Sequence, residues 1–396
     1  SYGEWHDVVM SYDEFDDNKV HLYANGSEVS YETQNTGGGA RDSDVNNELR
    51  IGNRTDGQRS LYGYIAQLVM YKRPIAESEL SGGKLLSLSR GNRPVLSVSG
   101  GHWDAVHLRD PILLMNEDGE VAQQNGQYVL YYTGKAASGV RGIGRALSSD
   151  GVHWTKSPSD AAVLTVGNAG CWDETDVHLG SVIKLNDGTY RLYYGGYNSS
   201  GTYGLGLATS DDGITFTKHG SNPLIVGSEW NSDNDVLAMP YVVKLSTGQW
   251  VLLFEGNSVF RIYLGTSSDG ITWSAANSGD ALMEGSAGEW DSNGVANPKV
   301  FELAAGKYLL GYNGQAGNAE WNIGFAYSTD LINWTKFSGN PVMVRGPAEW
   351  ERARIENAFI AKQDVGTDTV RMWYFGGPGS TYFPIGYATC QQTSTR

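Results

Sequence analysis

The chain has 396 residues and a formal net charge of −15. Its length exceeds the size at which one hydrophobic core keeps growing, so two domains are expected. The acidic balance makes nucleic acid and anionic membranes poor partners, and no run reaches the roughly 18 apolar residues of a membrane helix. We therefore expect neither nucleic-acid binding nor membrane insertion, and neutral or weakly charged ligands stay open.

Residues 1–80 show the alternation of half-buried strands. Strands are expected at 5–12 and 19–26, ending in the hairpin signal Asn25-Gly26, and again at 48–53 and 62–71. The motifs W-H-x-V, K-V-x-L-Y-x-N-G, L-x-I-G and G-Y-I-x-x-L follow in the order seen in the second half of a laminin-G-like, concanavalin-A-type jelly roll, which this segment resembles. The resemblance implies a partial β-sandwich over 1–80, followed by a linker at 81–84.

The strands that would precede Trp5 in that jelly roll are absent, which leaves an unpaired sheet edge. We expect the edge to associate with a missing N-terminal fragment, with another chain or with the rest of the protein. In that family the domain often binds sugar, sometimes through calcium. Asp13, Asp16 and Asp17 are therefore candidates for a structural calcium ion, although carboxylates before a strand more often belong to a solvated loop. No cofactor is required.

From residue 85 to the end, the sequence repeats itself. A Trp followed by an acidic or amide residue, a polar stretch and an apolar run recurs at intervals of 69, 58, 60 and 60 residues, at Trp103, Trp172, Trp230, Trp290 and Trp350. Each unit then contains two further strand-like runs, and each complete unit ends in an aromatic strand followed by an apolar pair. No unit contains a helix-period segment. Four short strands per unit and five units predict an all-β protein with a five-bladed β-propeller over residues 85–396.

Two regular features of the repeat read as framework. The third run of a unit ends in a Ser/Thr-x-Asp-Gly turn, in which Asp bonds the backbone two residues on, and the leading Trp is expected to pack between blades. The fifth unit lacks a fourth strand, whereas Leu85–Val98 ends in the same N-x-P-V-L pattern as the fourth strands. This segment is therefore predicted to form the outer strand of the last blade. Cys171 and Cys390 are expected to be free thiols.

The start of the first strand and the end of the second strand of each blade converge on a central funnel. Aligning the units on Val106, Val177, Val236, Val295 and Ile355 shows that the repeat is broken there by polar residues. Only a site for one asymmetric ligand requires such a break. The residues that we expect to line the funnel are His107, Arg109, Asp110, Asp176, His178, Asp235, Glu255, Asn297, Arg354, Glu356 and Asn357.

The blade text G-x-A-x-S-x-D-x-x-x-W-x-K resembles that of the five-bladed glycoside hydrolases of families 43 and 32. In those families a catalytic Asp precedes a Pro at the start of the first blade, which matches Asp110-Pro111 and implies a general base or a nucleophile. The families also place an acidic residue after Pro in blade two and a Glu two residues before Pro in blade three. This sequence has Gly180-Ser181 and Ala238-Met239-Pro240 there.

Glycoside hydrolysis needs one protonated and one ionised carboxyl group beside the glycosidic bond. The catalytic candidates are Asp110, Glu356, Asp235, Asp176 and Glu255. Asp110 is the expected ionised partner. The proton donor is expected to be the most desolvated group across the funnel, with Glu356 slightly favoured and His178 also able to donate a proton. The substrate-binding candidates are His107, Arg109, His178, Asn297, Arg354 and Asn357, and no metal is expected at the site.

Two hypotheses follow. The favoured one is an extracellular, secreted glycoside hydrolase that cleaves a polysaccharide or oligosaccharide, with inversion favoured by the resemblance to family 43. The alternative is a non-catalytic carbohydrate- or receptor-binding propeller, such as an adhesin or a phage tail-type protein, that kept the fold and lost the acid. The missing Glu of blade three favours the second hypothesis, and the asymmetric polar funnel favours the first.

Overall fold

The structure is a computed structural model that describes residues 8–12, 20–24, 27–28, 87–91, 93–230, 236–256, 260–317, 320–337, 339–346, 348–362, 369–379 and 382–391. The chain divides into two compact units, Ser1–Ser89 with Gln391–Arg396, and Arg90–Cys390. The described residues contain strands and short 3₁₀ turns and no α-helix. This all-β composition confirms the predicted fold class.

The first unit contains a small antiparallel sheet of β1 (Val8–Tyr12), β2 (Val20–Ala24) and β3 (Ser27–Glu28). The strands β1 and β2 pair where strands were expected, and β2 pairs antiparallel with β3. The predicted turn residues Asn25 and Gly26 lie outside the described residues. The remaining strands of the partial jelly roll and the calcium candidates Asp13, Asp16 and Asp17 lie outside the described residues. The boundaries at 80 and 85 stay a prediction.

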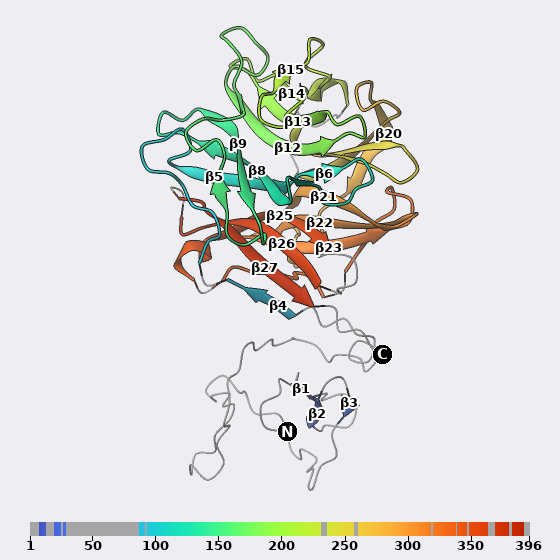
Figure 1. The fold of residues 1–396 in the computed structure, drawn as a ribbon. Coiled ribbons are helices and arrows are strands. Elements are labelled where there is room, and N and C mark those ends of the chain that lie inside the picture. Colours follow the sequence, from blue (N-terminus) through green and yellow to red (C-terminus); the bar gives the residue numbers. More distant parts are fainter. Residues whose placement is uncertain are drawn as a thin grey trace. The chain divides into compact units, whose positions relative to one another are not determined.

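The second unit is built from five sheets, which are antiparallel except for the parallel pair of β6 with β12 (Figure 1). The first two sheets contain β5 (His107–Leu113), β7 (Gln123–Gln124), β8 (Gln127–Lys135), β9 (Arg141–Ser148), β10 (Thr155–Lys156) and β11 (Leu164–Thr165), and then β6 (Met115–Asn116), β12 (Asp176–Lys184), β13 (Tyr190–Tyr197), β14 (Tyr203–Ser210), β15 (Thr217–Lys218) and β16 (Ile225–Val226). The other three contain β17 (Ala238–Lys244), β18 (Trp250–Gly256), β19 (Arg261–Ser267) and β20 (Ser274–Leu282); β21 (Gly294–Ala304), β22 (Lys307–Gln315), β23 (Trp321–Ser328) and β24 (Thr335–Lys336); and β25 (Arg354–Lys362), β26 (Thr369–Gly377), β27 (Ile385–Gln391) and β4 (Ser87–Arg90).

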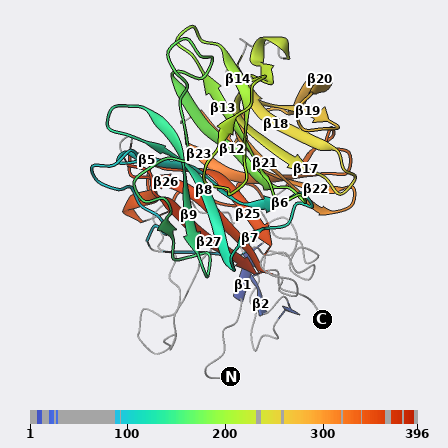
Figure 2. The same ribbon diagram turned by 45° about the horizontal axis from the view of Figure 1, so that its top comes forward.

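The five sheets form a closed ring. Their first strands contact one another in the order β5, β12, β17, β21 and β25, and β25 returns to β5. Figure 2 shows the red strands of the last blade beside the cyan and green strands of the first. Because each sheet is covered on both faces, successive side chains in the middle of the second strands are buried, as with Tyr131 and Tyr132 of β8. Apolar and aromatic residues therefore fill both faces of these strands.

The ring is closed by a segment from the beginning of the propeller, as predicted. The backbone N–H of Gly91 donates to the carbonyl of Tyr387, and the N–H of Val95 donates to the carbonyl of Ile385 at 2.8 Å. The N–H of Ile385 donates in return to the carbonyl of Leu96 at 2.9 Å. These bonds place the segment against β27 as the outer strand of blade five and cover an edge that would otherwise be open.

The leading Trp-Asp pair of the repeat is framework. Trp103 stacks on Tyr132 with ring centroids 6.0 Å apart, and a Cβ at Gly134 would lie only 2.4 Å from the indole. These contacts lie within the same blade, whereas we expected a position between blades. Buried Asp104 accepts hydrogen bonds from the Tyr132 hydroxyl at 3.0 Å and the Lys156 ammonium at 2.5 Å. The indole, the acid and the cation therefore tie the first, second and fourth strands together.

The same triad recurs in three other blades. Its acid, hydroxyl and cation are Asp173, Tyr194 and Lys218; Asp291, Tyr312 and Lys336; and Glu351, Tyr374 and Arg90. In blade five the cation is Arg90, which comes from the closing segment, 3.5 Å from Glu351. Among the described residues, four blades thus carry a buried polar clamp, and that of blade five includes the closing segment.

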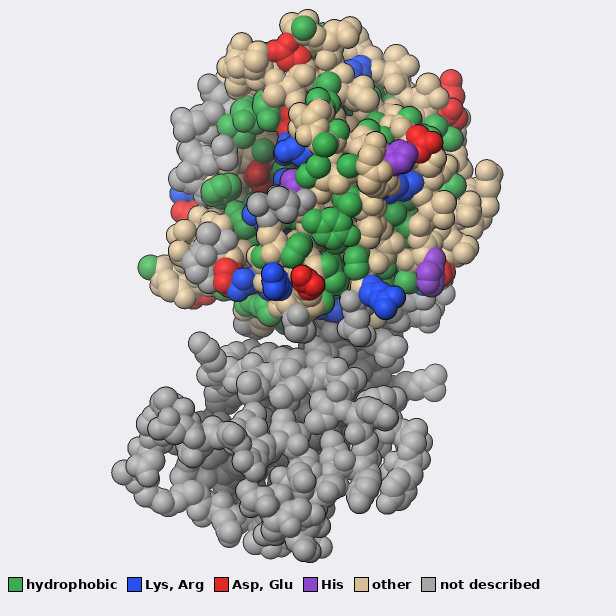
Figure 3. Space-filling view, turned by 90° about the vertical axis from the view of Figure 1, so that its left-hand side faces the viewer, with side chains coloured by type: hydrophobic (Ala, Val, Ile, Leu, Met, Phe, Trp, Pro, Cys, Tyr) green, Lys and Arg blue, Asp and Glu red, His purple; other side chains and the backbone are tan. Residues whose placement is uncertain are grey.

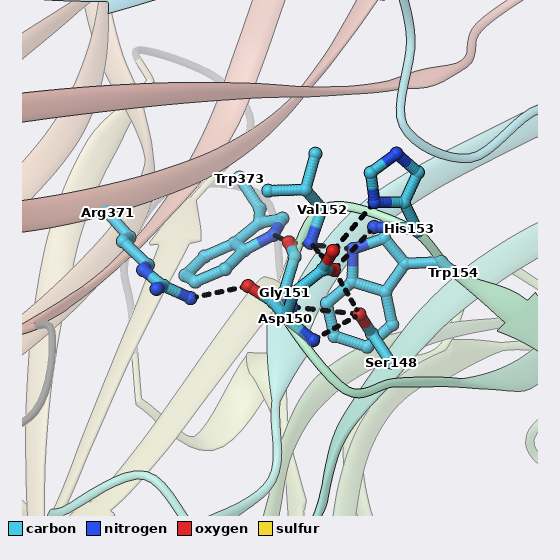
Figure 4. A network of polar contacts seen from close by, with 8 residues as sticks. All are labelled: Ser148, Asp150, Gly151, Val152, His153, Trp154, Arg371 and Trp373. Atoms are coloured by element: carbon cyan, nitrogen blue, oxygen red, sulfur yellow. Dashed lines mark hydrogen bonds and ion pairs between the residues drawn. The ribbon is translucent and has the colours of Figure 1, made fainter.

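The Asp-Gly turn fulfils its predicted role. The Asp150 carboxylate accepts the N–H groups of Val152 and His153, both at 2.8 Å, and the Ser148 hydroxyl accepts the N–H of Gly151 at 2.8 Å. Figure 4 shows these bonds converging on the carboxylate and the hydroxyl. Two backbone donors per carboxylate make the turn rigid.

Each of the first three turns also docks onto the second strand of the preceding blade. Trp373 of blade five donates to the Gly151 carbonyl at 2.9 Å, and Arg371 donates to the Asp150 carbonyl at 2.8 Å, as Figure 4 shows. Tyr131 of blade one donates in the same way to Gly213 of blade two at 2.6 Å. The turn is therefore both a strand connection and a contact between blades.

The turn carboxylates predict acid-sensitive stability. The N–H of Thr215 and then that of Ile214 lower the pKa of Asp212 from its ordinary 3.8 to about 2. A depressed folded-state pKa contributes stability above pH 3.8, and this contribution is lost as the pH falls towards 2. Asp212→Ala should lower stability by roughly 0.5–2 kcal/mol at pH 6, as a lost cap does, with the difference from wild type shrinking towards pH 2 in thermal melts. A constant difference, or an equal effect of the neighbouring Asp211→Ala, would contradict this role.

The surface of the propeller is mixed in character. Figure 3 shows basic, acidic, histidine and hydrophobic side chains interspersed on the face that it draws. In the described part of the chain, no helix is long and apolar enough to cross a membrane.

Candidate active site

The first strand of every blade is interrupted at the same place. The pairing register shifts after Arg109, His178 or Leu179, Ala238, Ala296 and Glu356, which marks a β-bulge in each blade. In four blades the bulge holds a non-glycine residue with positive φ, namely Asp110 at 53°, Met239 at 46°, Asn297 at 54° and Asn357 at 53°. Such conformations are uncommon and mark functional sites, because a bulge redirects the side chain it carries.

The bulges also correct the alignment of the repeats. Arg109 pairs with Thr133, His178 with Gly195, Ala238 with Glu255, Ala296 with Asn313 and Glu356 with Phe375, so these five pairs are equivalent. The residues before them are Leu108, Val177, Leu237, Val295 and Ile355. The alignment on Val106 and Val236 was therefore wrong by two residues in blade one and by one in blade three.

Asp110 lies in the bulge of blade one and is buried, with 1% of its surface exposed. Its carboxylate accepts a hydrogen bond of 2.6 Å from the side-chain amide of Asn357 in blade five. Asn357 occupies the equivalent bulge position and is held by its own N–H, which donates to Asn313 at 2.8 Å. A buried carboxylate held by a neighbouring blade keeps one orientation, which a catalytic group needs.

In blades two to five, the backbone of the bulge is hydrogen-bonded to a side chain of the preceding blade. In each case a bulge N–H donates to a side chain of the preceding blade, in the pairs Leu179 to Thr133, Met239 to His178, Asn297 to Glu255 and Asn357 to Asn313. Blade two lacks a side chain at the acceptor position, which is Gly195. A Cβ at Gly195 would lie 2.2 Å from Nε2 of His178. The glycine therefore leaves space for the imidazole of His178, which acts as the acceptor in place of a second-strand side chain.

His178 is neutral at physiological pH. Burial lowers the pKa of His178 to about 4. The charge of Asp110 raises this pKa, whereas the charges of Arg141 and Arg109 lower it further. Its Nε2 accepts the N–H of Met239 at 3.3 Å, so the ring proton lies on Nδ1. Because Nε2 of the neutral imidazole carries no proton and accepts a hydrogen bond, His178 is poorly suited to donate a proton from this atom. The carboxylic acids are the better proton donors.

Glu255 ends β18 in blade three and is 8% exposed. Burial raises the pKa of this carboxyl group to about 7, opposed by the N–H of Asn297, which donates to it at 3.0 Å. Glu356 raises the same pKa further, while Lys299 and Arg109 lower it. A carboxyl group that is half protonated near neutral pH fits a general acid.

Glu356 lies beside Asn357 in blade five and is 5% exposed. Its carboxylate is 3.0 Å from Nε of Arg354 and 3.8 Å from Arg109. Burial raises the pKa of Glu356, the two arginines lower it, and Asp110 raises it. The side chain of Asn297 also hydrogen-bonds it. Glu356 therefore pairs with Arg354 and Arg109, and it lies close enough to Asp110 for the two carboxyl groups to interact.

Lys299 of β21 is a buried cation that the sequence analysis did not single out. It is 1% exposed, donates to the Pro298 carbonyl at 3.3 Å and lies over the Tyr241 ring at 5.4 Å. Burial lowers its pKa to about 8, against the opposing effects of Asp110 and Glu255. The ammonium group therefore lies close enough to both carboxyl groups to influence them.

Arg141, at the start of β9, is a second cation absent from the sequence prediction. It forms an ion pair with Asp176, the first residue of β12. Burial lowers the pKa of Arg141, Arg109 lowers it further, and Asp110 raises it. The ion pair and these effects place Arg141, Asp176 and Arg109 at the same end of the funnel.

Aromatic rings line one side of the site. His107 stacks on Phe383 with ring centroids 4.2 Å apart, and Phe383 contacts Phe375 at 5.7 Å. The guanidinium groups of Arg109 and Arg354 lie 4.8 Å from Phe375 and 5.2 Å from Phe383, respectively. The rings fix the two arginines by cation–π contact. Phe375 and Phe383 are the third set of contributors that the sequence did not reveal.

The structure thus connects most of the expected residues by contact or by electrostatic interaction. Those that it links are Arg109, Asp110, His178, Glu255, Asn297, Arg354, Glu356 and Asn357, with His107 on the aromatic side and Asp176 beside Arg141. Asp235 lies outside the described residues. Among the described residues no group of three His, Cys, Asp or Glu side chains is arranged to hold a metal ion.

Comparisons with known proteins agree with this fold. The family model of the concanavalin A-like lectin/glucanases superfamily matches residues 1–81, and that of the glycosyl hydrolases family 32 N-terminal domain matches residues 107–297. An uncharacterized protein of Mycobacterium tuberculosis, Rv1502, is 28% identical over 212 residues, which span 50% of this chain and 66% of the relative.

Three solved structures show the same propeller fold. A glycosyl hydrolase from Bacteroides ovatus has 18% identity, covers 78% of this chain and 95% of its own, and has a TM-score of 0.61. A thermostable family-43 glycoside hydrolase has 16% identity, coverages of 76% and 98%, and a TM-score of 0.55. A GH130 structure, from a family described as mannoside phosphorylases that contains glycoside hydrolases, has 17% identity, coverages of 78% and 95%, and a TM-score of 0.60.

The chain therefore contains a region, residues 107–297, that matches the family model of glycosyl hydrolases family 32, within a fold shared with solved glycoside hydrolases. It is a five-bladed β-propeller that resembles families 43 and 32, preceded by a partial laminin-G-like segment.

Proposed function

We propose that this protein is an extracellular glycoside hydrolase that cleaves a polysaccharide or oligosaccharide in the central funnel of the propeller. The observation that supports it most is the presence of two buried carboxyl groups with different surroundings, Asp110 in blade one and Glu255 in blade three. Blades one and three are not neighbours in the ring, so a substrate can lie between these groups. One ionised and one protonated carboxyl group is the requirement of glycosidic cleavage.

Asp110 is the proposed ionised partner. It stands before Pro111, as the catalytic Asp of the similar families does, and the Asn357 amide donates to its carboxylate at 2.6 Å. A hydrogen bond to the charged form favours that form. Lys299, whose pKa the carboxylate of Asp110 raises, supplies a nearby positive charge.

Glu255 is the proposed proton donor, in preference to Glu356. The similar families carry their acid two residues before the Pro of blade three, where this chain has Ala238. Ala238 pairs directly with Glu255 across the ladder, and opposite residues of an antiparallel pair project to the same face. The glutamate of the second strand therefore reaches the region that the first strand leaves empty, and its pKa of about 7 suits proton donation.

Glu356 is better suited to hold the arginines of the funnel. Arg354 at 3.0 Å and Arg109 at 3.8 Å both favour its ionised form. We propose that Glu356 positions these two side chains, and that Asp176 does the same for Arg141.

The test of the proton donor uses glycosides whose leaving groups differ in acidity. Glu255→Gln removes the proton but keeps the shape, and should lower kcat on unactivated glycosides by roughly 10²–10⁴-fold. Aryl glycosides with acidic leaving groups depart without a proton, so the variant should retain most of its activity on them. Asp110→Asn should lose activity on both kinds of substrate.

Glu356→Gln is the matched control, because it changes the other buried glutamate of the funnel. It should weaken substrate binding without a dependence on the leaving group. If that dependence appears in Glu356→Gln and is absent from Glu255→Gln, Glu356 is the donor and the present assignment is wrong.

A further inference from the structure

Among the residues that the structure describes, the funnel holds as many cations as acids. The cations are Arg109, Arg141, Lys299 and Arg354, and the acids are Asp110, Asp176, Glu255 and Glu356. A proton donor must be protonated when the reaction starts, which leaves at most three negative charges against four positive ones. The described residues of the competent site therefore carry an excess positive charge in a chain whose formal net charge is −15.

Two of the cations lie together with unused donors. Arg109 on β5 and Arg141 on β9 belong to blade one and flank the same strand, β8, with which both strands pair. After burial, the positive charge of Arg109 is the next largest influence that lowers the pKa of Arg141. In the described part of the chain, Nε of Arg109 and Nε of Arg141 are both buried and meet no acceptor. Buried donors without partners are unfavourable, so a site with two of them is prepared for an acceptor that arrives with a ligand.

Arg261 shows what a satisfied arginine looks like on an equivalent part of the fold. It also begins the third strand of its blade, and its Nε and Nη2 donate to Glu284 at 3.1 Å and 3.2 Å. The pair Arg141 and Asp176 leaves Nε of the arginine and Oδ1 of the aspartate without a hydrogen bond in the described residues. The Nε–H donor of Arg141 is thus available to a ligand. The side chain of Arg141 is 24% exposed.

We propose that Arg109 and Arg141 receive a carboxylate of the substrate, so that the enzyme acts on a glycan residue of the uronic acid class. A carboxylate accepts paired N–H donors from guanidinium groups, and a uronic acid carries one close to its glycosidic bond. This inference rests on the proposed hydrolase function and specifies its substrate. Neutral sugars offer hydroxyl groups, which do not compensate the excess charge.

The experiment compares sugars that differ in one group. Matched 4-nitrophenyl pairs, glucoside with glucuronide and galactoside with galacturonide in both anomeric forms, are assayed for kcat/KM with the full chain. Binding of free glucuronate and galacturonate, against glucose and galactose, is measured by calorimetry and needs no catalysis. The uronide should be preferred by roughly 10-fold or more in one pair, the scale of a charge-assisted hydrogen bond.

The variants locate the preference. Arg141→Gln should bring the uronide-to-neutral ratio close to one, Arg141→Lys should keep part of it, and the matched Arg261→Gln should leave it unchanged. The near-ultraviolet circular dichroism of each variant shows that the fold is kept. If Arg141→Gln fails to fold, the Arg141→Lys ratio and the wild-type ratio decide.

Each outcome is decisive. Uronate binding without hydrolysis would support this inference and refute the proposed hydrolase. Equal treatment of both members of every pair, or a preference for the neutral sugar, would overturn the inference while leaving the hydrolase intact. Faster cleavage of neutral glycosides on addition of inorganic phosphate would assign the arginines to a free phosphate ion and would also overturn it.

Discussion

Asp110→Asn should lower kcat on natural glycosides by roughly 10²–10⁴-fold while leaving glycan binding within a few-fold of wild type. The amide keeps the volume and one acceptor of the carboxylate, so the bond from Asn357 can persist. It removes the charge that activates water or attacks the sugar. The loss should therefore lie in kcat rather than in KM, which is the mark of an interaction made in the transition state.

Asn357→Ala is the informative companion to that variant. It keeps the Asp110 carboxylate but removes the 2.6 Å hydrogen bond that orients it. We expect a smaller loss of kcat, because the charge remains and only its position relaxes. If Asn357→Ala is inactive and Asp110→Asn is active, the nucleophilic or basic role does not belong to Asp110.

Asp104→Asn should destabilise the propeller by about 3–5 kcal/mol, because it leaves a buried ammonium without its counter-charge. Asp104 is fully buried, and Lys156, 10% exposed, lies 2.5 Å from it. The Tyr132 hydroxyl loses a charged acceptor in the same step. The measurement is the urea dependence of unfolding at pH 7, compared at equal m-value.

Two further variants separate the buried clamp from ordinary surface charge. Glu320→Gln breaks the ion pair with Arg345, where both side chains are 34% exposed, and should change stability by less than about 1 kcal/mol. The double variant Asp104→Asn with Lys156→Met should recover much of the lost stability, since the unpaired charge is gone. A single variant as stable as wild type would show that the Trp-Asp pair is not framework.

Features of the fold that repeat along the chain could be predicted because each copy supports the others. The five Trp residues set the number of blades, and the N-x-P-V-L pattern before Val98 located the closing strand, now seen in the bonds between Leu96 and Ile385. Local chemistry also sufficed for the Asp-Gly turn, since Asp150 bonds residues only two and three positions away. The direction in which Trp103 packs required the three-dimensional arrangement of Gly134 and Gly144.

The site was predicted less completely, because a bulge inserts a residue and changes which side chains face the funnel. In blade one the pairing register identifies Leu108 as the equivalent residue, two positions beyond the Val106 of our alignment. Lys299 stands in an apolar run, where a strand lysine usually reaches solvent, and charged residues are rarely buried without a partner. Its position became clear only from its burial and from the effects of Asp110 and Glu255.

The choice between Glu255 and Glu356 illustrates the same limit. The sequence slightly favoured Glu356, because it occupies in blade five the position that the acid of the similar families holds in blade three. Pairing across the ladder cannot be read from one strand alone, and it places Glu255 opposite Ala238. The two arginines beside Glu356 come from residues 109 and 354, which are far apart in the sequence.

The most direct measurement of the central claim is the release of reducing ends from a panel of plant, algal and microbial glycans. The panel includes neutral and uronic-acid-containing polysaccharides, and each is incubated with wild type and with Asp110→Asn in parallel with a binding assay. We expect the wild type to release reducing ends from at least one glycan that both proteins bind, and the variant to release none. Binding of a glycan by both proteins with no release by either would contradict the hydrolase and identify the propeller as a carbohydrate-binding module.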